Sequence, residues 1–325
     1  MSSIEMIRAA AGRIEGKARV TPLLSSSFLD EIAGHRIWIK AECLQHTGSF
    51  KFRGAWSAIS ALPEVDRARG VIAFSSGNHA QGVALAAARH NTSSVIIMPS
   101  DAPAIKIANT KALGADVVLY DRATEDRDAV AERVNHNQNM TVVKPFDNEY
   151  VIAGQGTVGL EIAAQAGAFG VSKAQVLVPC GGGGLTSGIA LALEAEAPDM
   201  RVHPCEPEGF DDVKRSLISG QIEVNARTTG SICDAIITPS PGELTLPHMK
   251  HLCSAGFAVS DTECLHAMAL AFDRLRIVIE PGGAAALAAA LFHSDALESD
   301  DVIVVASGGN VDKSMFVNAL TQFGA

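Results

Sequence analysis

The chain has 325 residues, of which 47% are hydrophobic and 19% charged, with a formal net charge of −10 at pH 7 and a sequence pI of about 5.5. This composition supplies a large core and excludes a disordered chain, and the length suggests about two domains. The acidic balance argues against nucleic acid as a partner, because phosphate binding needs clustered Lys and Arg. No apolar run reaches the ~20 residues of a membrane-spanning helix, and the first residues lack the apolar core of a signal peptide.

The six cysteines lie far apart in the chain and include no CxxC pair. Such spacing is typical of reduced thiols and predicts neither a disulfide framework nor a zinc site. We therefore expect a cytoplasmic protein that has no membrane or nucleic-acid partner.

In the first half of the chain, hydrophobic periodicity predicts helices that alternate with short strands. Short buried strands separated by helices are typical of βαβ units and a parallel sheet. The predicted strands are 36–40, 71–74, 95–98, 117–120 and 141–143, and the predicted helices are 4–14, one from about 79, 103–113 and 125–135.

The alternation resumes after Gly154-Gln155-Gly156, where a helix is predicted through Ile162. Strands follow at 176–178, 200–203 and 302–305, with helices after 184 and over 287–292, and the Pro- and Thr-rich stretch 220–247 predicts long loops. We therefore predict an α/β fold of two open, twisted, mostly parallel sheets flanked by helices. The expected division is a large domain of residues 1–69 and 148–325, with residues 70–147 inserted as a small domain.

Lys51 lies between two phenylalanines in the stretch Thr47-Gly48-Ser49-Phe50-Lys51-Phe52. Apolar surroundings disfavour the ammonium and lower the pKa of a lysine. A neutral lysine is a nucleophile that forms a Schiff base with a carbonyl compound. The alternative is a surface lysine whose aliphatic stem packs past its neighbours.

Three unusual motifs follow predicted strands, at the carboxyl ends where parallel α/β sheets bind ligands. The run Gly181-Gly182-Gly183-Gly184 opens a helix, and its amides suit a phosphate; a flexible turn is the alternative. It is neither a P-loop nor a GxGxxG fingerprint. A Schiff-base lysine, a phosphate cradle and a serine at a strand end together suggest pyridoxal phosphate. The other two motifs are Ser75-Ser76-Gly77-Asn78-His79 and Ser307-Gly308-Gly309-Asn310.

The motifs, taken in order, resemble the serine/threonine dehydratases, a family of fold-type II pyridoxal phosphate enzymes that includes serine racemases and threo-3-hydroxyaspartate dehydratases. The likeness runs from Thr21-Pro22-Leu23 to Asp312 and includes the Lys51 stretch, the three strand-end motifs and Glu280-Pro281. It implies a fold similar to the tryptophan synthase β subunit, a small amino acid as substrate, and a homodimer.

The resemblance also implies individual roles. Lys51 would hold the cofactor as a Schiff base and move the Cα proton, and Arg127 would approach the substrate; a solvated surface ion pair is the alternative for Arg127. The residues implied in cofactor binding are Phe50, Lys51, Asn78, Gly181, Gly182, Gly183, Gly184, Leu185 and Ser307. Those implied in the loop that binds the substrate carboxylate are Ser75, Ser76, Gly77, Asn78 and His79. Core packing is the alternative for Phe50, and a turn-forming role is the alternative for Asn78.

A second site is implied at Glu206-Pro207-Glu208-Gly209-Phe210-Asp211-Asp212. In the family, the first acid, a main-chain carbonyl four residues on and the acid six residues on hold a divalent cation. These positions are Glu206, Phe210 and Asp212 here. Oxygen ligands suit Mg²⁺, Ca²⁺ or Mn²⁺, and the alternative is a pair of solvated or helix-capping acids.

The resemblance implies that Ser307 places a neutral hydroxyl at the ring nitrogen, which would favour loss of a β-substituent over a long-lived carbanion. We therefore predict a dehydratase (ammonia-lyase) that releases a 2-oxo acid and ammonia, with L-threo-3-hydroxyaspartate first among substrates, then L-serine and L-threonine. The candidate cations for an acidic substrate are Arg127, Lys106 and His46.

Three other functions stay open. The resemblance implies that Ser76 lies on the face opposite Lys51, where it would support serine racemase activity, alone or beside dehydration. A weak likeness in Glu280-Pro281-Gly282-Gly283 and in the proline-rich stretch 239–247 points to dehydratases of hydroxyectoine catabolism. The last alternative is a relative that binds pyridoxal phosphate without chemistry, which the intact reactive positions disfavour.

Overall fold

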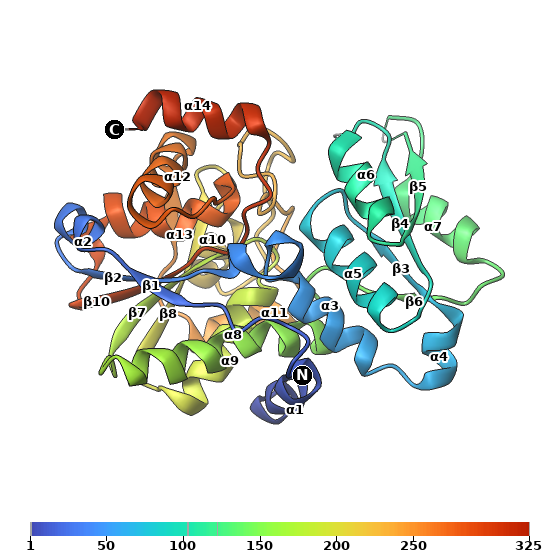
Figure 1. Cartoon of the computed structure of the whole chain (residues 1–325), viewed down its shortest axis with the longest axis horizontal. Coiled ribbons are helices and arrows are strands. Elements are labelled where there is room, and N and C mark those ends of the chain that lie inside the picture. Colours follow the sequence, from blue (N-terminus) through green and yellow to red (C-terminus); the bar gives the residue numbers. More distant parts are fainter. Residues whose placement is uncertain (1, 103, 122, 325) are drawn as a thin grey trace.

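Two sheets organise the chain, and they lie at opposite ends of its long axis (Figure 1). The structure, a computed structural model, describes residues 2–102, 104–121 and 123–324, without the side chains of Arg127 and Asp128. One sheet has six strands in the order β1-β2-β10-β7-β8-β9, and the other has four in the order β5-β4-β3-β6. Every strand pairing is parallel except that of β1 with β2. The predicted class of two mostly parallel sheets is confirmed.

Strand β10 runs through the middle of the larger sheet, and all of its residues are buried. A central parallel strand is covered on both faces, which explains its unbroken run of Val302, Ile303, Val304 and Val305. The strands of this sheet are β1 (Leu23–Ser25), β2 (Arg36–Lys40), β7 (Ala174–Pro179), β8 (Met200–Pro207), β9 (Phe257–Val259) and β10 (Asp301–Val305).

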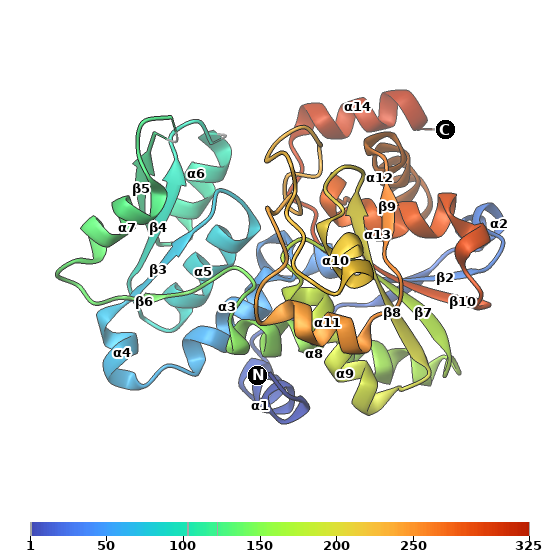
Figure 2. The same ribbon diagram turned by 180° about the vertical axis from the view of Figure 1, so that it is seen from behind.

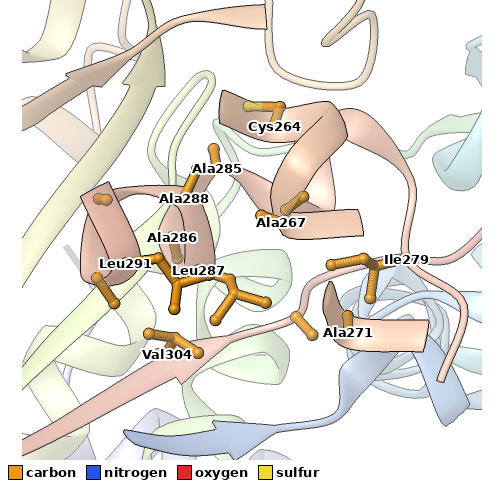
Figure 3. Packing of buried hydrophobic residues seen from close by; sticks show 14 of the residues in the cluster. Cys264, Ala267, Ala271, Ile279, Ala285, Ala286, Leu287, Ala288, Leu291 and Val304 are labelled. Carbon is orange, nitrogen blue, oxygen red and sulfur yellow. The ribbon is translucent and has the colours of Figure 1, made fainter. Parts of the chain in front are cut away.

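Helices cover both faces of the six-stranded sheet. α8 and α9 pack on one face, and α12 and α13 on the other (Figure 2). α13 is buried from Pro281 to Leu291, because its sequence is apolar on every side. Figure 3 shows its Leu287 and Leu291 beside Val304 of β10. The helices of this part are α1 (Ile4–Ile14), α2 (Ser27–Ala33), α8 (Glu149–Ala168), α9 (Gly184–Glu196), α10 (Asp212–Ser219), α11 (Thr245–Leu252), α12 (Asp261–Leu275), α13 (Pro281–Phe292) and α14 (Lys313–Phe323), with short 3-10 turns at η1 (Glu42–Leu44), η2 (His46–Gly48) and η3 (Ser294–Ala296).

The four-stranded sheet lies between two layers of helices. α5 and α3 pack on one face, where Phe52 and Ala55 join the core of this sheet, and α7 packs on the other. α3 also contacts α8, so it connects the two parts of the molecule. The proposed domain boundaries near residues 70 and 147 stay a prediction. The elements are α3 (Lys51–Ser60), α4 (Glu64–Arg69), β3 (Val71–Phe74), α5 (Asn78–Arg89), β4 (Ser94–Pro99), α6 (Ala104–Ala112), β5 (Asp116–Tyr120), α7 (Arg127–Asn135) and β6 (Thr141–Val142).

The prediction that a helix begins after Gly154-Gln155-Gly156 is wrong, because α8 begins at Glu149 and runs through these residues. The glycines serve close helix packing. A Cβ on Gly154 would lie 2.6 Å from the carbonyl oxygen of Arg53 in α3, and one on Gly188 of α9 would lie 2.5 Å from the carbonyl oxygen of Ile152 in α8. Three helices thus approach one another at backbone distance.

Several elements lie outside the helices and strands predicted from the sequence. Helices α10, α12 and α14 and strand β9 belong to this group. α12 begins with a capping box formed by Ser260 and Glu263. The predicted loop 220–247 is irregular up to Leu244, and α11 begins at Thr245. None of the helices in the described residues combines the length and apolar character of a membrane crossing.

Close packing of α8 against α9 predicts a position-specific response to an added methyl group. Gly188→Ala places its Cβ against main-chain atoms of Ile152 and Gly156, which cannot move aside. We expect a loss of about 1–3 kcal/mol, measured as a lower thermal unfolding midpoint. Gly167→Ala, in the same helix pair but with no atom within 4 Å of its Cβ, is the control. It should leave the midpoint unchanged or raise it. Equal midpoints for the two variants would contradict the packing argument.

Candidate active site

Lys51 is the first residue of α3 and faces the segment that leaves the four-stranded sheet. Its Nζ donates a hydrogen bond to the carbonyl oxygen of Pro145 at 2.7 Å and lies 5.2 Å from the centroid of the Phe50 ring. Burial lowers the pKa of Lys51 to about 8, and the nearby charge of Glu280 opposes part of this shift. A far larger share of its amine is therefore neutral at pH 7 than for an ordinary lysine.

The Asn78 side chain is fixed at both of its polar atoms, at the first residue of α5. Its Nδ2 donates to Oε1 of Glu280 at 2.5 Å, and its Oδ1 accepts from Nδ2 of Asn310 at 2.7 Å. Burial raises the pKa of Glu280 to about 7, and the Asn78 hydrogen bond lowers it in part. Three elements distant in sequence, α5, the start of α13 and the segment after β10, thus meet at one amide group.

Asn310 also stabilises the turn that precedes Lys51. Its Nδ2 donates to the carbonyl oxygen of Thr47 at 2.7 Å. Thr47 has a φ of 59°, in the left-handed region that non-glycine residues seldom adopt. One asparagine therefore fixes both the entry to the lysine helix and the orientation of Asn78.

His79 is buried and neutral. Burial and the nearby charge of Lys51 lower its pKa to about 3, although the hydrogen bond to Val143 opposes the shift. Nε2 lies 2.8 Å from the carbonyl oxygen of Val143, and because a carbonyl only accepts, this nitrogen carries the proton. The imidazole is thus turned toward main chain, and any contribution to the neighbouring loop comes from its amide.

The rest of the loop before α5 is partly exposed. The hydroxyl of Ser75 accepts from the amide of Gly77 at 3.1 Å, which stabilises a tight turn. Ser76 lies within this turn, directly before Gly77 and α5, and within the described residues its hydroxyl has no hydrogen-bond partner. The loop ends at the N-terminus of a helix of 12 residues, where main-chain amides can receive an anion.

The tetraglycine run joins β7 to α9. Gly183 has a φ of 88°, which suits glycine, and α9 begins at Gly184. A Cβ on Gly182 would lie 2.3 Å from the ring of Phe146, and one on Gly184 would lie 3.0 Å from its Cα. Because Pro145 holds Lys51 and Phe146 covers the glycines, one dipeptide connects the lysine to the run. Leu185 follows, buried in the first turn of α9.

Ser307 is buried just after β10. Its carbonyl oxygen accepts from the amide of Phe50 at 3.1 Å, and the next residue, Gly308, pairs with Ser49. A Cβ on Gly308 would lie 3.1 Å from Nδ2 of Asn78. The structure thus brings Ser307, Phe50, Lys51 and Asn78 into one region, as the strand-end argument predicts.

The three candidate cations differ in position. Arg127 begins α7, and its side chain lies outside what the structure describes. His46 packs its ring edge-on against Phe52, at a centroid distance of 5.1 Å. Lys106 forms an ion pair with Asp234 at 3.2 Å and contributes to the electrostatics of Glu280. Lys106 thus acts electrostatically on Glu280, whereas His46 packs against the helix that begins with Lys51.

The implied metal positions lie at the end of β8 and the start of α10. Glu206 is buried, and its two oxygens accept from the amides of Val213 and Lys214 at 2.8 and 2.7 Å. The Glu206 carboxylate thus caps α10, which is the alternative to a metal ligand, and its role as a ligand stays a prediction. Burial, together with the charge of Asp212, raises the pKa of Glu206 well above its usual range.

Asp212 is the second buried carboxylate of this cluster. Its Oδ1 accepts from Nδ2 of Asn225 at 2.5 Å, whereas its buried Oδ2 has no hydrogen-bond partner among the described residues. Burial raises the pKa of Asp212 to about 6. Phe210 is buried in the same turn. The described residues include no group of three or more His, Cys, Asp or Glu side chains that could hold a metal, and this set has only two carboxylates.

Some residues of the site carry no recognisable sequence signal. Pro145 and Val143 act through main-chain carbonyls, which any residue supplies. Glu280 and Asn310 lie in the recognised motifs, but no pattern shows that both bind Asn78. Asn310 follows the end of β10, but Glu280 lies between α12 and α13, so the strand-end argument does not suggest this contact.

Comparisons with known proteins agree with this geometry. Residues 14–308 match the protein family described as pyridoxal-phosphate dependent enzyme. The L-threo-3-hydroxyaspartate ammonia-lyase of Pseudomonas sp is 40% identical over 320 residues, which cover 98% of this chain and 99% of that protein. A serine racemase of Oryza sativa subsp. indica is 38% identical over 324 residues, covering 98% and 94%.

Solved structures give the same answer. The crystal structure of a threonine deaminase from T.th. matches with a TM-score of 0.90 at 43% identity, covering 95% of this chain and 99% of that one. The predicted fold-type II architecture and the resemblance to dehydratases and racemases are both confirmed. The chain belongs to the family of pyridoxal-phosphate-dependent enzymes.

Proposed function

We propose that this protein is a dehydratase (ammonia-lyase) that converts L-threo-3-hydroxyaspartate to a 2-oxo acid and ammonia, with L-serine and L-threonine as poorer substrates. The observation that carries the proposal is the desolvated amine of Lys51, which binds Pro145 beside the Phe146 that packs on the glycine run. Ammonia-lyases for L-threo-3-hydroxyaspartate and L-threonine are among the relatives, at 40% and 38% identity. Pyridoxal phosphate, when bound, withdraws electrons from the substrate Cα and so permits loss of its proton and of the β-hydroxyl.

The residues around Lys51 fit this cofactor. The glycine run has no side chains of its own at the start of α9, so its amides suit a phosphate, although the Phe146 ring lies against Gly182. We assign the phosphate to Gly181, Gly182, Gly183, Gly184 and Leu185. Ser307 offers a neutral group for the ring nitrogen, Phe50 an apolar wall, and Asn78 a fixed amide for the phenolic oxygen.

The substrate carboxylate is assigned to the loop of Ser75, Ser76, Gly77, Asn78 and His79, whose amides lie at the N-terminus of α5. Because His79 stays neutral down to low pH, it neither adds positive charge nor donates a proton from an imidazolium. Lys51 is then the group that removes the Cα proton, since its lowered pKa makes the neutral amine available. Arg127 stays a proposed substrate contact.

Substrate tests of this function are direct. We expect release of 2-oxo acid in the order L-threo-3-hydroxyaspartate, L-serine, L-threonine, and Lys51→Ala should reduce kcat at least about 10³-fold because both the attachment and the base are lost. Lys144→Ala, an exposed lysine beside Pro145, is the control and should keep full activity. Full activity of Lys51→Ala, or no 2-oxo acid from any of the three amino acids, would refute the proposal.

Ser76 supports racemisation as the second candidate function, because its hydroxyl is unpartnered within the described residues and a serine racemase is 38% identical. Chiral analysis of unreacted serine in the same assays decides between the two. If Ser76 returns the Cα proton from the opposite face, Ser76→Ala abolishes exchange of the enantiomers and keeps 2-oxo acid release. Fast exchange without ammonia would make racemase the main activity. The geometry gives no support to hydroxyectoine catabolism or to binding without catalysis.

The lowered pKa of Lys51 predicts how the cofactor-free protein takes up pyridoxal phosphate. Attack on the aldehyde needs the neutral amine, which is about a tenth of Lys51 at pH 7 and fewer than about one in a thousand for an ordinary lysine. The rate of covalent attachment, followed by absorbance, should rise from pH 7 and level off above pH 8. N-acetyl-lysine, treated in parallel, should continue to rise to pH 10. A protein curve that follows the model amine would show that Lys51 is not desolvated.

We also propose a divalent cation, Mg²⁺, Ca²⁺ or Mn²⁺, on Glu206, the carbonyl oxygen of Phe210 and Asp212. The unpartnered buried oxygen of Asp212 and the raised pKa of both carboxylates support it, because a cation would offset their charges. Its role would be to order the turn between β8 and α10.

The cation proposal is tested by stability. Adding Mg²⁺, Ca²⁺ or Mn²⁺ to chelator-treated protein should raise the thermal unfolding midpoint, and Asp212→Asn should remove that increase. Glu208→Gln, an exposed acid in the same segment, should keep it. If none of the three cations shifts the midpoint of the unmodified protein, the assignment is wrong.

We further propose a homodimer in the cytoplasm. The exposed apolar side chains of Phe28 and Ile32 on α2 give one surface that a second copy could cover. The cysteines are all free, as a reducing compartment favours.

A further inference from the structure

An ion pair joins the two sheet-bearing parts of the molecule at the edge of the candidate site. Lys106 belongs to α6, beside the four-stranded sheet, and Asp234 belongs to the loop between α10 and α11. Their Nζ and Oδ2 atoms lie 3.2 Å apart. The pair therefore links the part of the molecule that holds the four-stranded sheet to the part that holds the six-stranded sheet.

The Asp234 loop lies against the cofactor residues. A Cβ on Gly181 would lie 3.2 Å from Cα of Ile236, and one on Gly282 would lie 3.3 Å from Cβ of Ala235. Asp234, Lys106 and Lys51 all influence the pKa of Glu280, whose carboxylate holds Asn78. The Lys106 ammonium thus lies within electrostatic reach of the same carboxylate as Lys51.

The two members of the pair are unequally covered. The Lys106 side chain is 16% exposed, whereas that of Asp234 is 62% exposed. An ion pair with one solvated partner contributes little stability, so Asp234 can be displaced at small cost. A largely covered ammonium, by contrast, makes a strong charge-assisted hydrogen bond to any carboxylate that enters the site.

We propose that Lys106 is a specificity-determining residue that binds the side-chain carboxylate of a dicarboxylic amino acid, with this carboxylate taking the place of Asp234. The inference rests on the proposed function and names how its preferred substrate is recognised. The α-carboxylate binds at the loop before α5, and the second carboxylate reaches across the site to α6. L-Serine and L-threonine lack that group and gain nothing from Lys106.

The test separates binding from turnover. The dissociation constants of L-aspartate and L-alanine are measured on the holoenzyme from the absorbance change of the cofactor, for the unmodified protein, Lys106→Met, Lys106→Arg and the control Lys111→Met. Lys111 is exposed in the last turn of the same helix. Lys106→Met should raise the dissociation constant of L-aspartate about 10- to 100-fold and change that of L-alanine by less than about threefold. Lys106→Arg should restore most of the L-aspartate affinity, and Lys111→Met should change neither ligand.

The outcomes are distinguishable. Equal weakening of both amino acids by Lys106→Met, no weakening of either, or no preference of the unmodified protein for L-aspartate would overturn the inference. Turnover of L-threo-3-hydroxyaspartate is assayed on the same samples. If the unmodified protein binds L-aspartate through Lys106 but does not release 2-oxo acid from L-threo-3-hydroxyaspartate, the subsite stands and the proposed substrate falls.

Asp234→Asn gives an independent check. This change removes the competing carboxylate and leaves the ammonium in place, so the affinity for L-aspartate should rise while that for L-alanine stays the same. A fall in L-aspartate affinity would show that Asp234 helps to position Lys106. It would refute the proposal that the substrate carboxylate takes the place of Asp234.

Discussion

The buried guanidinium of Arg53 is the interaction on which the rest of the structure depends. Arg53 is fully buried, and it donates to Glu42 at 2.7 Å and to Glu161 at 2.6 Å. Lys40, also fully buried, pairs with Glu161 at 2.5 Å. Two cations and two carboxylates offset one another, as burial of charge demands. Loss of one partner would leave an unpaired charge in the interior, so the cluster fixes β2, η1, α3 and α8 relative to one another.

Arg53 of this cluster lies two residues from Lys51, in the same first turn of α3. The orientation of that turn is therefore set by charges outside the site. Backbone contacts fix this turn further. Gly54 allows α8 to approach closely, and the amide of Phe50 donates to the carbonyl oxygen of Ser307. A desolvated lysine is costly, and the rigidity of this surrounding keeps it from turning toward water.

The sequence predicts the frame of this arrangement well because parallel sheets obey simple rules. Val71, Val176 and Val302 lie in apolar runs that mark buried strands, and the polar motifs follow the ends of those strands. Prediction from the sequence fails where one residue type has two structural roles. Glycine can break a helix or allow two helices to touch, and Gly154 and Gly188 do the second. Main-chain acceptors such as the carbonyl of Pro145 have no signature at all.

The contrast between Ser307 and Asp234, which we propose lie beside the cofactor and the substrate, has the same physical origin. Ser307 is 4% exposed and held by main-chain pairing, so its position follows from the fold that the whole family shares. The Asp234 side chain is 62% exposed and is held by one weak ion pair with Lys106, which lies beside the other sheet. The position of a residue such as Ser307 changes only if the fold changes. The contacts of a residue such as Asp234 can change with a single substitution or with the entry of a ligand. The position of Lys51 is therefore predictable from sequence motifs, whereas the surroundings of exposed charges such as Asp234 are not.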